Sequence, residues 1–432
     1  MRNRRHPPPP KLSGMRPESL MMSHGYVPEW SEGSIKPPIF QTSTFAFRSA
    51  EEGKEFFQYA YGLKERDPKR PMGLIYSRLN NPDLEILEER LNLWDEAECT
   101  AVFSSGMSAI STSLMALVGV GESVVFSRPV YGGTDLLLEE ILPERGVVTR
   151  EFSAGAQAEE VESICRELEE AGTPPKVVFL ETPANPTMIM TDIEAMAAVA
   201  HRNGALCVVD NTFLGPLYQK PLLHGADLVL YSATKYLGGH SDLVAGVALG
   251  SLELIDRIKM YRTIFGTMLA PYSAWLLMRS LETAQLRITR ARENAEQVAA
   301  WLVKQPQVEW VHFPGLLTEG RQKEIFDKQC TGPGGMIAFC LKDAGEKEAF
   351  RFLNSVKLIK LAVSLGGTES LIEHPATMTH SDIPVEQQEA IGITPALVRL
   401  SVGIEHPDDL IGCLAYALDQ VAVEDTEPIE VP

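Results

Sequence analysis

The chain has 432 residues, 44% of them hydrophobic, which is enough for a sizeable core divided between two domains. Its net charge of −19 and isoelectric point near 5.0 argue against a nucleic-acid partner, because phosphate backbones require basic patches. No apolar stretch reaches the roughly 18–20 residues of a membrane span, so we expect no membrane partner.

The two ends of the chain are expected to carry no chemistry. Residues 1–23 contain the run Pro7–Pro10 and little periodic hydrophobicity, which is typical of a flexible lead. Prolines also stand where a secretory signal would have its apolar core. The six cysteines lack CxxC pairs and suit a reducing compartment, so we expect a cytoplasmic protein. Val423–Pro432 is acidic and is typical of a frayed tail.

The segment from His24 to Arg70 is rich in proline and aromatic residues. It is too apolar for a linker and too short for a core of its own, so we expect it to pack against another surface. The run Asn80-Asn81-Pro82 follows, and taken alone it predicts a turn.

Short apolar runs alternate with helical segments from residue 83 onward. Asp83–Leu93 has leucines at helical spacing, and Ser108–Leu117 is also helix-like. The strand candidates are Ala101–Phe103, Glu122–Phe126, Val177–Leu180, Leu206–Val209 and Leu228–Tyr231. This alternation indicates an α/β sheet with a ligand at the carboxyl ends of its strands.

Polar residues follow several of these strands. Ser105, Gly106 and Met107 come after the first strand and before a helix, where free backbone N–H groups can bind a phosphate. The alternative for this serine is an ordinary helix N-cap. Tyr131 and Asp210 also follow strands, although an aromatic residue there is more often used for packing and an aspartate is often a helix cap.

The most informative stretch is Leu228–Gly246, where a strand stops before Ser232, Thr234 and Lys235. A lysine amine that loses its proton near neutral pH, through burial or nearby positive charge, can form a Schiff base. The neighbouring hydroxyls suit phosphate oxygens, and the glycine pair that follows lets the backbone approach a bulky ligand. These residues suggest a phosphorylated aldehyde cofactor and no metal.

Two other interpretations of this stretch are open. A lysine after a strand is commonly a solvated surface residue. Ser232 to Lys235 also fits the S-x-x-K pattern of serine β-lactamases and penicillin-binding proteins, but the S-D-N and K-T-G partners of that pattern are missing from the chain.

The pattern changes in the C-terminal part. After Ala270 it becomes helical and leads into Ala291–Val303, so we place a domain change there. A glycine-rich segment then opens the strand candidate Met336–Leu341, typical of a smaller α+β domain. In the last strand candidate, Val398–Ile404, alternation places Val398, Leu400, Val402 and Ile404 on one face and Arg399, Ser401 and Glu405 on the other. A lone arginine on a strand is usually solvated.

At SATKYLGGHSD, residues 232–242, the chain resembles the cofactor-lysine signature of the fold-type I pyridoxal-phosphate enzymes of cysteine and methionine metabolism. The resemblance runs from about Ser23 to Gln420. It implies a lead and intersubunit arm in residues 1–70, a large cofactor-binding domain with a mostly parallel sheet in residues 71–280, and a smaller α+β domain in residues 281–432. Against this family, Tyr59–Met72 looks longer than usual and has no assigned role.

The resemblance implies that Lys235 holds pyridoxal 5′-phosphate, that Asp210 keeps its pyridine nitrogen protonated and that Asn185 lies near the ring oxygen. Tyr131 would stack on the ring and protonate a leaving group. The implied phosphate ligands are Ser105, Gly106, Met107, Ser232 and Thr234, joined across a dimer interface by Tyr76 and Arg78.

The resemblance also implies substrate contacts. Arg399 would bind the substrate α-carboxylate, and Val363 and Ser364, in the loop Leu361–Gly367, would face the substrate. Together these roles describe elimination at the γ-carbon of an L-amino acid. The best candidate reaction is the conversion of L-methionine to 2-oxobutanoate, ammonia and methanethiol.

Two positions bear on the leaving group. Val363 stands where cystathionine γ-lyases tend to place a glutamate, and an apolar residue favours an uncharged distal group. Gly133, however, stands where methionine γ-lyases commonly carry a cysteine. This departure keeps open a cystathionine γ-synthase, an O-acylhomoserine sulfhydrylase, a cystathionine γ-lyase, or a γ-lyase for an oxygen-linked substrate such as canavanine.

Other classes of protein are also open. An aminotransferase of the same fold would depend on an added 2-oxo acid. A non-catalytic binding protein would normally have lost one of the residues named above. If Tyr76 and Arg78 act across an interface, the active unit is at least a homodimer, and the resemblance implies a dimer of dimers.

Overall fold

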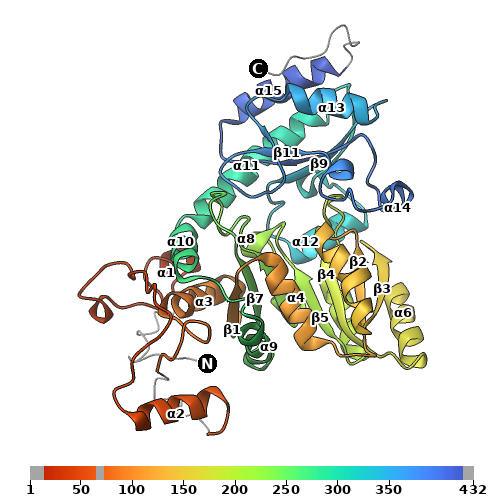
Figure 1. The fold of residues 1–432 in the computed structure, drawn as a ribbon. Helices are drawn as coiled ribbons and strands as arrows, with labels where there is room; N and C mark the ends of the chain where they lie inside the picture. Colours follow the sequence, from red (N-terminus) through yellow and green to blue (C-terminus); the bar gives the residue numbers. More distant parts are fainter. Residues whose placement is uncertain (1–13, 65–72, 422–432) are drawn as a thin grey trace.

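The computed structural model describes residues 14–64 and 73–421, which contain two β-sheets (Figure 1). The larger sheet has seven strands in the order β1-β7-β6-β5-β4-β2-β3, and the smaller has five in the order β10-β11-β12-β9-β8. The expected architecture, a large and mostly parallel sheet with a smaller C-terminal sheet, is confirmed.

The strands of the large sheet are β1 (Cys99–Phe103), β2 (Ser123–Arg128), β3 (Val148–Ser153), β4 (Pro175–Glu181), β5 (Leu206–Asp210), β6 (Leu228–Ser232) and β7 (Gly246–Gly250). Strand β7 runs antiparallel to both of its neighbours, β1 and β6, and the remaining pairs are parallel. The carboxyl ends of all strands but β7 therefore lie at one edge of the sheet, where ligands bind in open α/β folds.

Helices cover both faces of the large sheet. They are α3 (Pro82–Asp95), α4 (Gly106–Leu117), α5 (Gly132–Leu136), α6 (Ala158–Glu170), α7 (Ile193–Arg202), α8 (Gly215–Tyr218), α9 (Leu252–Phe265) and α10 (Pro271–Leu281). Phe126 and Phe179 pack with α4 and α9 on one face, while Val125 and Val178 pack with α6 and α7 on the other. Successive strand residues point to opposite faces, so burial on both sides explains why these strands are apolar throughout.

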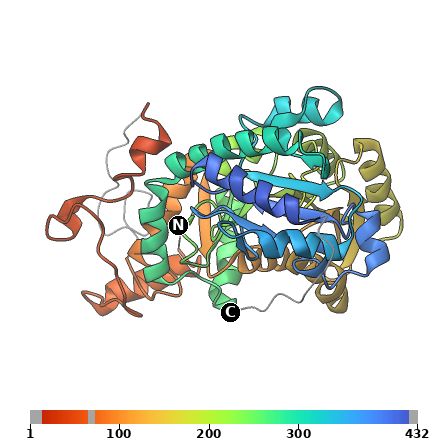
Figure 2. The same ribbon diagram turned by 90° about the horizontal axis from the view of Figure 1, so that it is seen from above.

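The small sheet consists of β8 (Val308–His312), β9 (Met336–Leu341), β10 (Lys360–Leu361), β11 (Leu371–Glu373) and β12 (Leu397–Ser401). Its helices are α11 (Ala284–Leu302), α12 (Arg321–Gln329), α13 (Glu346–Ser355), α14 (Val385–Ala390) and α15 (Pro407–Gln420). Helices α11, α13 and α15 cover one face, as the view from above shows (Figure 2). From the opposite face, Met336 and Ala338 pack with Phe213 and Tyr236, so an apolar cluster joins the two sheets.

Most predicted elements are confirmed, with one correction among the strands. The predicted strand Met336–Leu341 matches β9, whereas the predicted strand Val398–Ile404 is too long because β12 ends at Ser401. The carboxylate of Glu405 accepts hydrogen bonds from Ser370, which turns the chain away from the sheet. Ile404 is consequently part exposed and does not share the buried face of Val398.

The N-terminal segment contains α1 (Pro17–Leu20) and α2 (Ala50–Ala60) and projects from the body of the molecule (Figure 1). Leu20 and Met21 are buried, and Met21 packs with Leu84 and Leu87 of α3. The prediction of a flexible lead is therefore wrong for this stretch. The run Pro7–Pro10, residues 65–72 of the long segment, and the predicted tail lie outside the described residues.

None of the helices in the part of the chain that the structure describes is long and apolar enough to cross a bilayer.

Candidate active site

A cavity of about 300 Å³ lies where the carboxyl ends of the large sheet face the small sheet. Of the residues predicted from the sequence, those lining it are Ser105, Gly106, Met107, Tyr131, Asn185, Asp210, Ser232, Thr234, Lys235, Val363, Ser364 and Arg399. Residues almost 300 positions apart meet here because the parallel strands end at one edge and the small domain closes over it.

The N-terminus of α4 forms one wall of the cavity. Ser105 is its N-cap, since its Oγ accepts a hydrogen bond from the backbone N–H of Ser108 at 2.9 Å. A Cβ on Gly106 would lie 2.8 Å from the Cβ of Ser232, so glycine is required for the helix to approach the end of β6. The first backbone N–H groups of a helix lack intrahelical partners and attract anions. Ser105 is thus an N-cap placed at a potential phosphate site.

Thr234 lines the cavity, but its hydroxyl is also engaged elsewhere. Its Oγ1 accepts a hydrogen bond from the backbone N–H of Ala245 at 3.0 Å and donates to the carbonyl oxygen of the same residue at 3.3 Å. These bonds tie the turn that carries Lys235 to the segment leading into β7.

Lys235 is half-buried in a tight turn after β6. Its Nζ donates a hydrogen bond to Ser364 Oγ at 2.8 Å, across the space between the two sheets. Burial, and then the positive charge of Arg399, lowers the pKa of Lys235 to about 8. The interpretation of Lys235 as a solvated surface residue is therefore excluded, because its amine loses its proton far more readily than that of an exposed lysine.

Asp210 and Glu181 end the neighbouring strands β5 and β4, and both carboxyls are buried. Thr212 donates two hydrogen bonds to Asp210 Oδ1, from its backbone N–H at 3.0 Å and its hydroxyl at 2.6 Å. Burial raises the pKa of Asp210 to about 6; burial and the charge of Asp210 raise the pKa of Glu181 well above its usual range. The proton of this pair therefore resides on Glu181, and Asp210 is the anion at the floor of the cavity.

Arg399 is buried on β12 and faces the cavity, which excludes the alternative of a solvated strand arginine. Its Nη1 donates to Asn185 Oδ1 at 2.8 Å and pairs with Glu373 Oε1 at 2.9 Å, while its Nη2 donates to the carbonyl oxygen of Ser364 at 3.1 Å. Ser364 has a backbone φ of 145°, a conformation whose cost for a non-glycine residue is about 1–3 kcal/mol. In this strained conformation Ser364 contacts both cations of the site, Lys235 and Arg399.

Tyr131 lies half-exposed at the mouth of the cavity, and its backbone N–H donates to Glu181 Oε2 at 2.8 Å. Two glycines follow it. A Cβ on Gly132 would lie 2.5 Å from the carbonyl oxygen of Thr379, and a Cβ on Gly133 would lie 2.9 Å from Cε1 of the Tyr131 ring. These glycines therefore let the tyrosine pack closely against both its own helix and the small domain.

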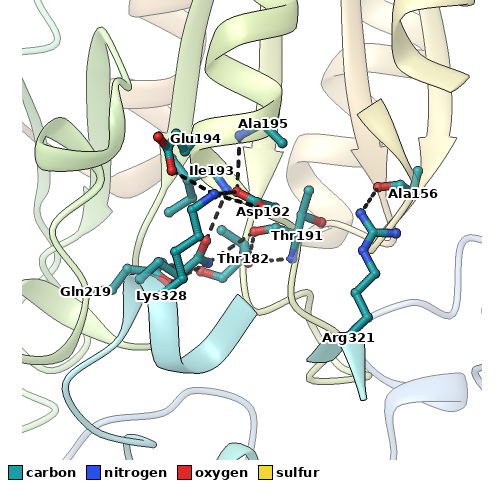
Figure 3. A network of polar contacts seen from close by, with 11 residues as sticks. Ala156, Thr182, Thr191, Asp192, Ile193, Glu194, Ala195, Gln219, Arg321 and Lys328 are labelled. Carbon is teal, nitrogen blue, oxygen red and sulfur yellow. Dashed lines mark hydrogen bonds and ion pairs between the residues drawn. The ribbon is translucent and has the colours of Figure 1, made fainter. Parts of the chain in front are cut away.

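Helix α12 of the small domain contacts the segment between β4 and α7, which carries Asn185. Figure 3 shows part of this contact, where Lys328 of α12 reaches Asp192. Gln322 bonds to both backbone groups of Met190, accepting at 2.7 Å and donating at 2.9 Å. Lys328 pairs with Asp192 and Glu194, and Arg321 donates to the carbonyl oxygen of Ala156 at 2.9 Å. The loop after β4 is consequently fixed from the small-domain side.

Tyr76 and Arg78 do not line this cavity. Tyr76 is 41% exposed, and Arg78 donates from Nη1 to the carbonyl oxygen of Thr263, near the end of α9, at 2.9 Å. Within one subunit they are therefore not brought together with the other predicted phosphate ligands, and their action across an interface stays a prediction.

Four polar residues of the site were not assigned from the sequence. Glu181 and Thr212 lie in the same strand-end motifs as Asn185 and Asp210, so their positions were a usable signal. Glu373 and Thr379 come from a segment without a recognisable motif, and only the folded chain places them beside Arg399.

Comparison with known proteins agrees with this geometry. The sequence profile of the family described as "Cys/Met metabolism PLP-dependent enzyme" matches residues 18–419. The L-methionine gamma-lyase of Pseudomonas putida is 42% identical over 412 residues, covering 94% of this chain and 98% of that protein. The cystathionine gamma-lyase of Bacillus subtilis is 38% identical over 409 residues, covering 94% of this chain and 100% of that protein.

A solved structure is similar over the same span. The crystal structure of cystathionine gamma synthase from Xanthomonas oryzae pv. oryzae, in complex with aminoacrylate and cysteine, has a TM-score of 0.84 and 33% sequence identity. The match covers 95% of this chain and 99% of that one. Lyases and synthases are thus both among the similar proteins.

Proposed function

Because this chain belongs to the family of Cys/Met metabolism PLP-dependent enzymes, we propose that it is a γ-lyase for an L-amino acid with an uncharged group on its γ-carbon, with L-methionine as the best candidate. The observation that carries the proposal is the meeting of Lys235, Asp210 and Arg399 in one cavity whose mouth is partly apolar. The reaction would convert L-methionine and water to 2-oxobutanoate, ammonia and methanethiol.

The residues of the cavity fit pyridoxal 5′-phosphate, the cofactor of this family. The glycine-dependent approach of α4 to β6 leaves an anion position beside Ser105, Gly106, Met107 and Ser232, with Thr234 close by. Asp210 supplies the buried negative charge that suits a protonated pyridine nitrogen, and Asn185 would lie at the ring oxygen. Lys235 supplies an amine of lowered pKa for the aldehyde.

When bound, the cofactor supplies an electron sink for the bond broken at the α-carbon. The protein supplies position and protons. Arg399 holds the α-carboxylate through its guanidinium. The Lys235 amine takes the α-proton and passes protons toward the β-carbon, while the hydroxyl of Tyr131 protonates the departing group.

Two side-chain observations support an uncharged leaving group. Val363 and Val244 line the cavity and are each more than half exposed, so its outer part offers no charge from these residues to a distal carboxylate or amine. Gly133 lies beside the Tyr131 ring and Met107, since a Cβ on it would lie 2.9 Å from Cε1 of Tyr131 and 3.2 Å from Sδ of Met107, so no side chain at this position takes up space between them. The alternatives, γ-replacement by a synthase or sulfhydrylase, cystathionine cleavage, and cleavage of an oxygen-linked substrate such as canavanine, use the same residues.

The exposed apolar surface supports a homo-oligomer, for which we propose a dimer of dimers. Tyr61 of the N-terminal segment is 67% exposed and Ile264 of α9 is 75% exposed, and both border a second cavity of about 230 Å³ beside Arg78. A neighbouring subunit that covered this surface would bring Tyr76 and Arg78 near its own cofactor phosphate. The six cysteines are free thiols, which suits a cytoplasmic location.

The test is 2-oxobutanoate release by the cofactor-loaded protein given L-methionine without any added thiol. Rapid release together with methanethiol would support the proposal. If nothing is released although the cofactor absorbance shifts on adding the amino acid, the leaving group is wrong. Acylhomoserines with thiols, cystathionine and canavanine would then be assayed in turn.

A further inference from the structure

A chain of polar contacts runs behind Arg399 and ends at the backbone next to Tyr131. Glu373, at the end of β11, pairs its Oε1 with Arg399 Nη1 at 2.9 Å. Thr379 Oγ1 lies 3.0 Å from the same Oε1 and 3.0 Å from His380 Nδ1. His380 Nε2 lies 3.2 Å from the carbonyl oxygen of Val130, the residue before Tyr131. Glu373 and His380 are both fully buried.

The number of protons in this chain of polar contacts follows from the groups at its two ends. Each of the contacts Glu373–Thr379, Thr379–His380 and His380–Val130 needs one proton between its two heavy atoms. A carbonyl oxygen at one end only accepts, and so does an ionised carboxylate at the other. A neutral histidine supplies one proton and the threonine hydroxyl supplies one. An ionised Glu373 beside a neutral His380 would therefore leave one pair of acceptors without a proton.

The third proton has two possible positions, on Glu373 as a carboxylic acid or on His380 as an imidazolium. Both satisfy all three contacts, and they interconvert without exchange with solvent. In the transfer, the Thr379 hydroxyl proton passes to Glu373 Oε1 while the His380 Nδ1 proton passes to Thr379 Oγ1, so the total stays constant.

The surroundings favour the proton on Glu373. Burial raises the pKa of Glu373, against the opposing charges of Arg399, Lys235 and His374. Burial, and then the charge of Arg399, lowers the pKa of His380 to about 4, against the opposing charge of Asp382. His374 is itself bonded to Thr377 Oγ1 and to the carbonyl oxygen of Pro395, both at 2.8 Å, and makes no contact of this chain.

The position of the proton matters for the substrate, and here the inference rests on the proposed function, in which Arg399 binds an α-carboxylate. A substrate carboxylate would share the guanidinium with Glu373, in a cavity that already contains the negative charge of Asp210. An ionised Glu373 would repel the substrate, because like charges at this range oppose each other strongly in a buried site. A neutral Glu373 can accept from Arg399 and donate to Thr379 at the same time.

We propose that Glu373 is a positioning residue for the substrate carboxylate: it is a neutral acid when the carboxylate is bound, it obtains its proton from His380 through Thr379, and it orients Arg399 without competing for its charge. The same chain of polar contacts supports the turn at Tyr131, since the carbonyl oxygen of Val130 accepts from His380 and Gly132 packs on the carbonyl oxygen of Thr379.

The experiment compares two probes on the holoenzyme. L-Norleucine has no γ-leaving group, and n-pentylamine is the same chain without the carboxylate. Their dissociation constants are measured from the change in cofactor absorbance between pH 6 and 9. The ratio of the two constants, pentylamine over norleucine, isolates the contribution of the carboxylate.

We expect Glu373→Gln to keep this ratio within about threefold of the wild-type value, because a neutral amide replaces a neutral acid. Thr379→Val keeps the shape of the side chain but breaks the transfer, so Glu373 stays ionised and repels the substrate carboxylate, which should lower the ratio about tenfold. Thr379→Ser is the matched control and should stay within about threefold. In the Glu373→Gln background, Thr379→Val should have little effect, since no proton has to move.

A tenfold change in the ratio for Glu373→Gln, in either direction, would overturn the proposal, because Glu373 would then act as an anion. An equal loss from Thr379→Val in both backgrounds would overturn it too. A wild-type ratio near one, with normal cofactor absorbance, would instead reject Arg399 as the carboxylate-binding residue, and with it both the proposed function and this inference.

Infrared spectroscopy provides an independent readout. With norleucine bound, the spectrum of the wild-type holoenzyme minus that of Glu373→Gln should contain the C=O stretching band of a protonated carboxyl group. Absence of that band would overturn the proposal whatever the binding constants are.

Discussion

Replacing Gly133 by alanine should slow catalysis without harming the fold. The new Cβ would lie 2.9 Å from Cε1 of Tyr131 and 3.2 Å from Sδ of Met107, where ordinary contact begins at 3.4 Å. The methionine sulfur is the flexible end of a side chain and can move away. The tyrosine ring is half-exposed at the cavity mouth, so it can also move, but then it leaves the position from which it would protonate the leaving group.

The size of the effect follows from this overlap. The ring must shift by about 0.5 Å at Cε1, and because misplacement of a reacting group by about 1 Å can cost 100-fold, we expect kcat to fall about tenfold. Stability should change in the opposite direction, since Gly133 lies within α5 and alanine is better than glycine in a helix by about 0.5–1 kcal/mol. A lower kcat with an unchanged or slightly higher Tm is the expected combination.

The assay is 2-oxobutanoate release from the best amino-acid substrate, measured for wild type, Gly133→Ala, Tyr131→Phe and the double variant. If the alanine acts through the tyrosine hydroxyl, it should add little to the loss that Tyr131→Phe has already caused. The reasoning would be refuted if Gly133→Ala kept kcat within twofold of wild type, or if it cost the same factor in both backgrounds.

The remaining predictions concern two ionisable groups, Lys235 and Asp95. Lys235→Ala should abolish 2-oxobutanoate release while the Tm stays near that of wild type, and retained turnover would rule out its role. Since burial and Arg399 lower the pKa of Lys235 from 10.5 to about 8, the apoprotein should capture the cofactor aldehyde faster as the pH rises through about 8 in stopped-flow absorbance; a midpoint near 10.5 would contradict this. Burial raises the pKa of Asp95 from 3.8 to about 7, so ionising this group opposes folding, and stability falls as the pH rises from about 4 to 7. Asp95→Asn should therefore raise the free energy of unfolding at pH 8 by up to about 4 kcal/mol, and the Tm with it, but should raise neither at pH 4. Equal increases in Tm at both pH values would contradict this prediction.

Much of the site could be predicted because its residues follow strands. Ser105, Tyr131, Asn185, Asp210 and Lys235 all come directly after apolar runs, and parallel strands bring such positions to one edge of a sheet. Glycines supplied a second signal: Gly106 was predicted to belong to the phosphate site, and it also lets α4 approach β6.

The end of β12 shows where local pattern fails. Val398, Leu400 and Val402 alternate as a strand should, and all three are buried. The strand nevertheless stops at Ser401, because Glu405 bonds to Ser370 of a distant loop. Alternation cannot reveal a partner that lies 35 residues away in the chain.

The sequence by itself determined the α/β alternation, the strand-end positions of the site and the identity of its lysine, because these depend on neighbouring residues and on the two-residue period of a strand. Only the tertiary structure decided that Arg399 is buried, that Glu373, Thr379 and His380 lie behind it, and that Tyr76 and Arg78 lie outside the cavity of their own subunit. The reason is physical: burial and charge pairing set the pKa values and the proton positions of a site, and both depend on which segments, far apart in the sequence, lie together in space.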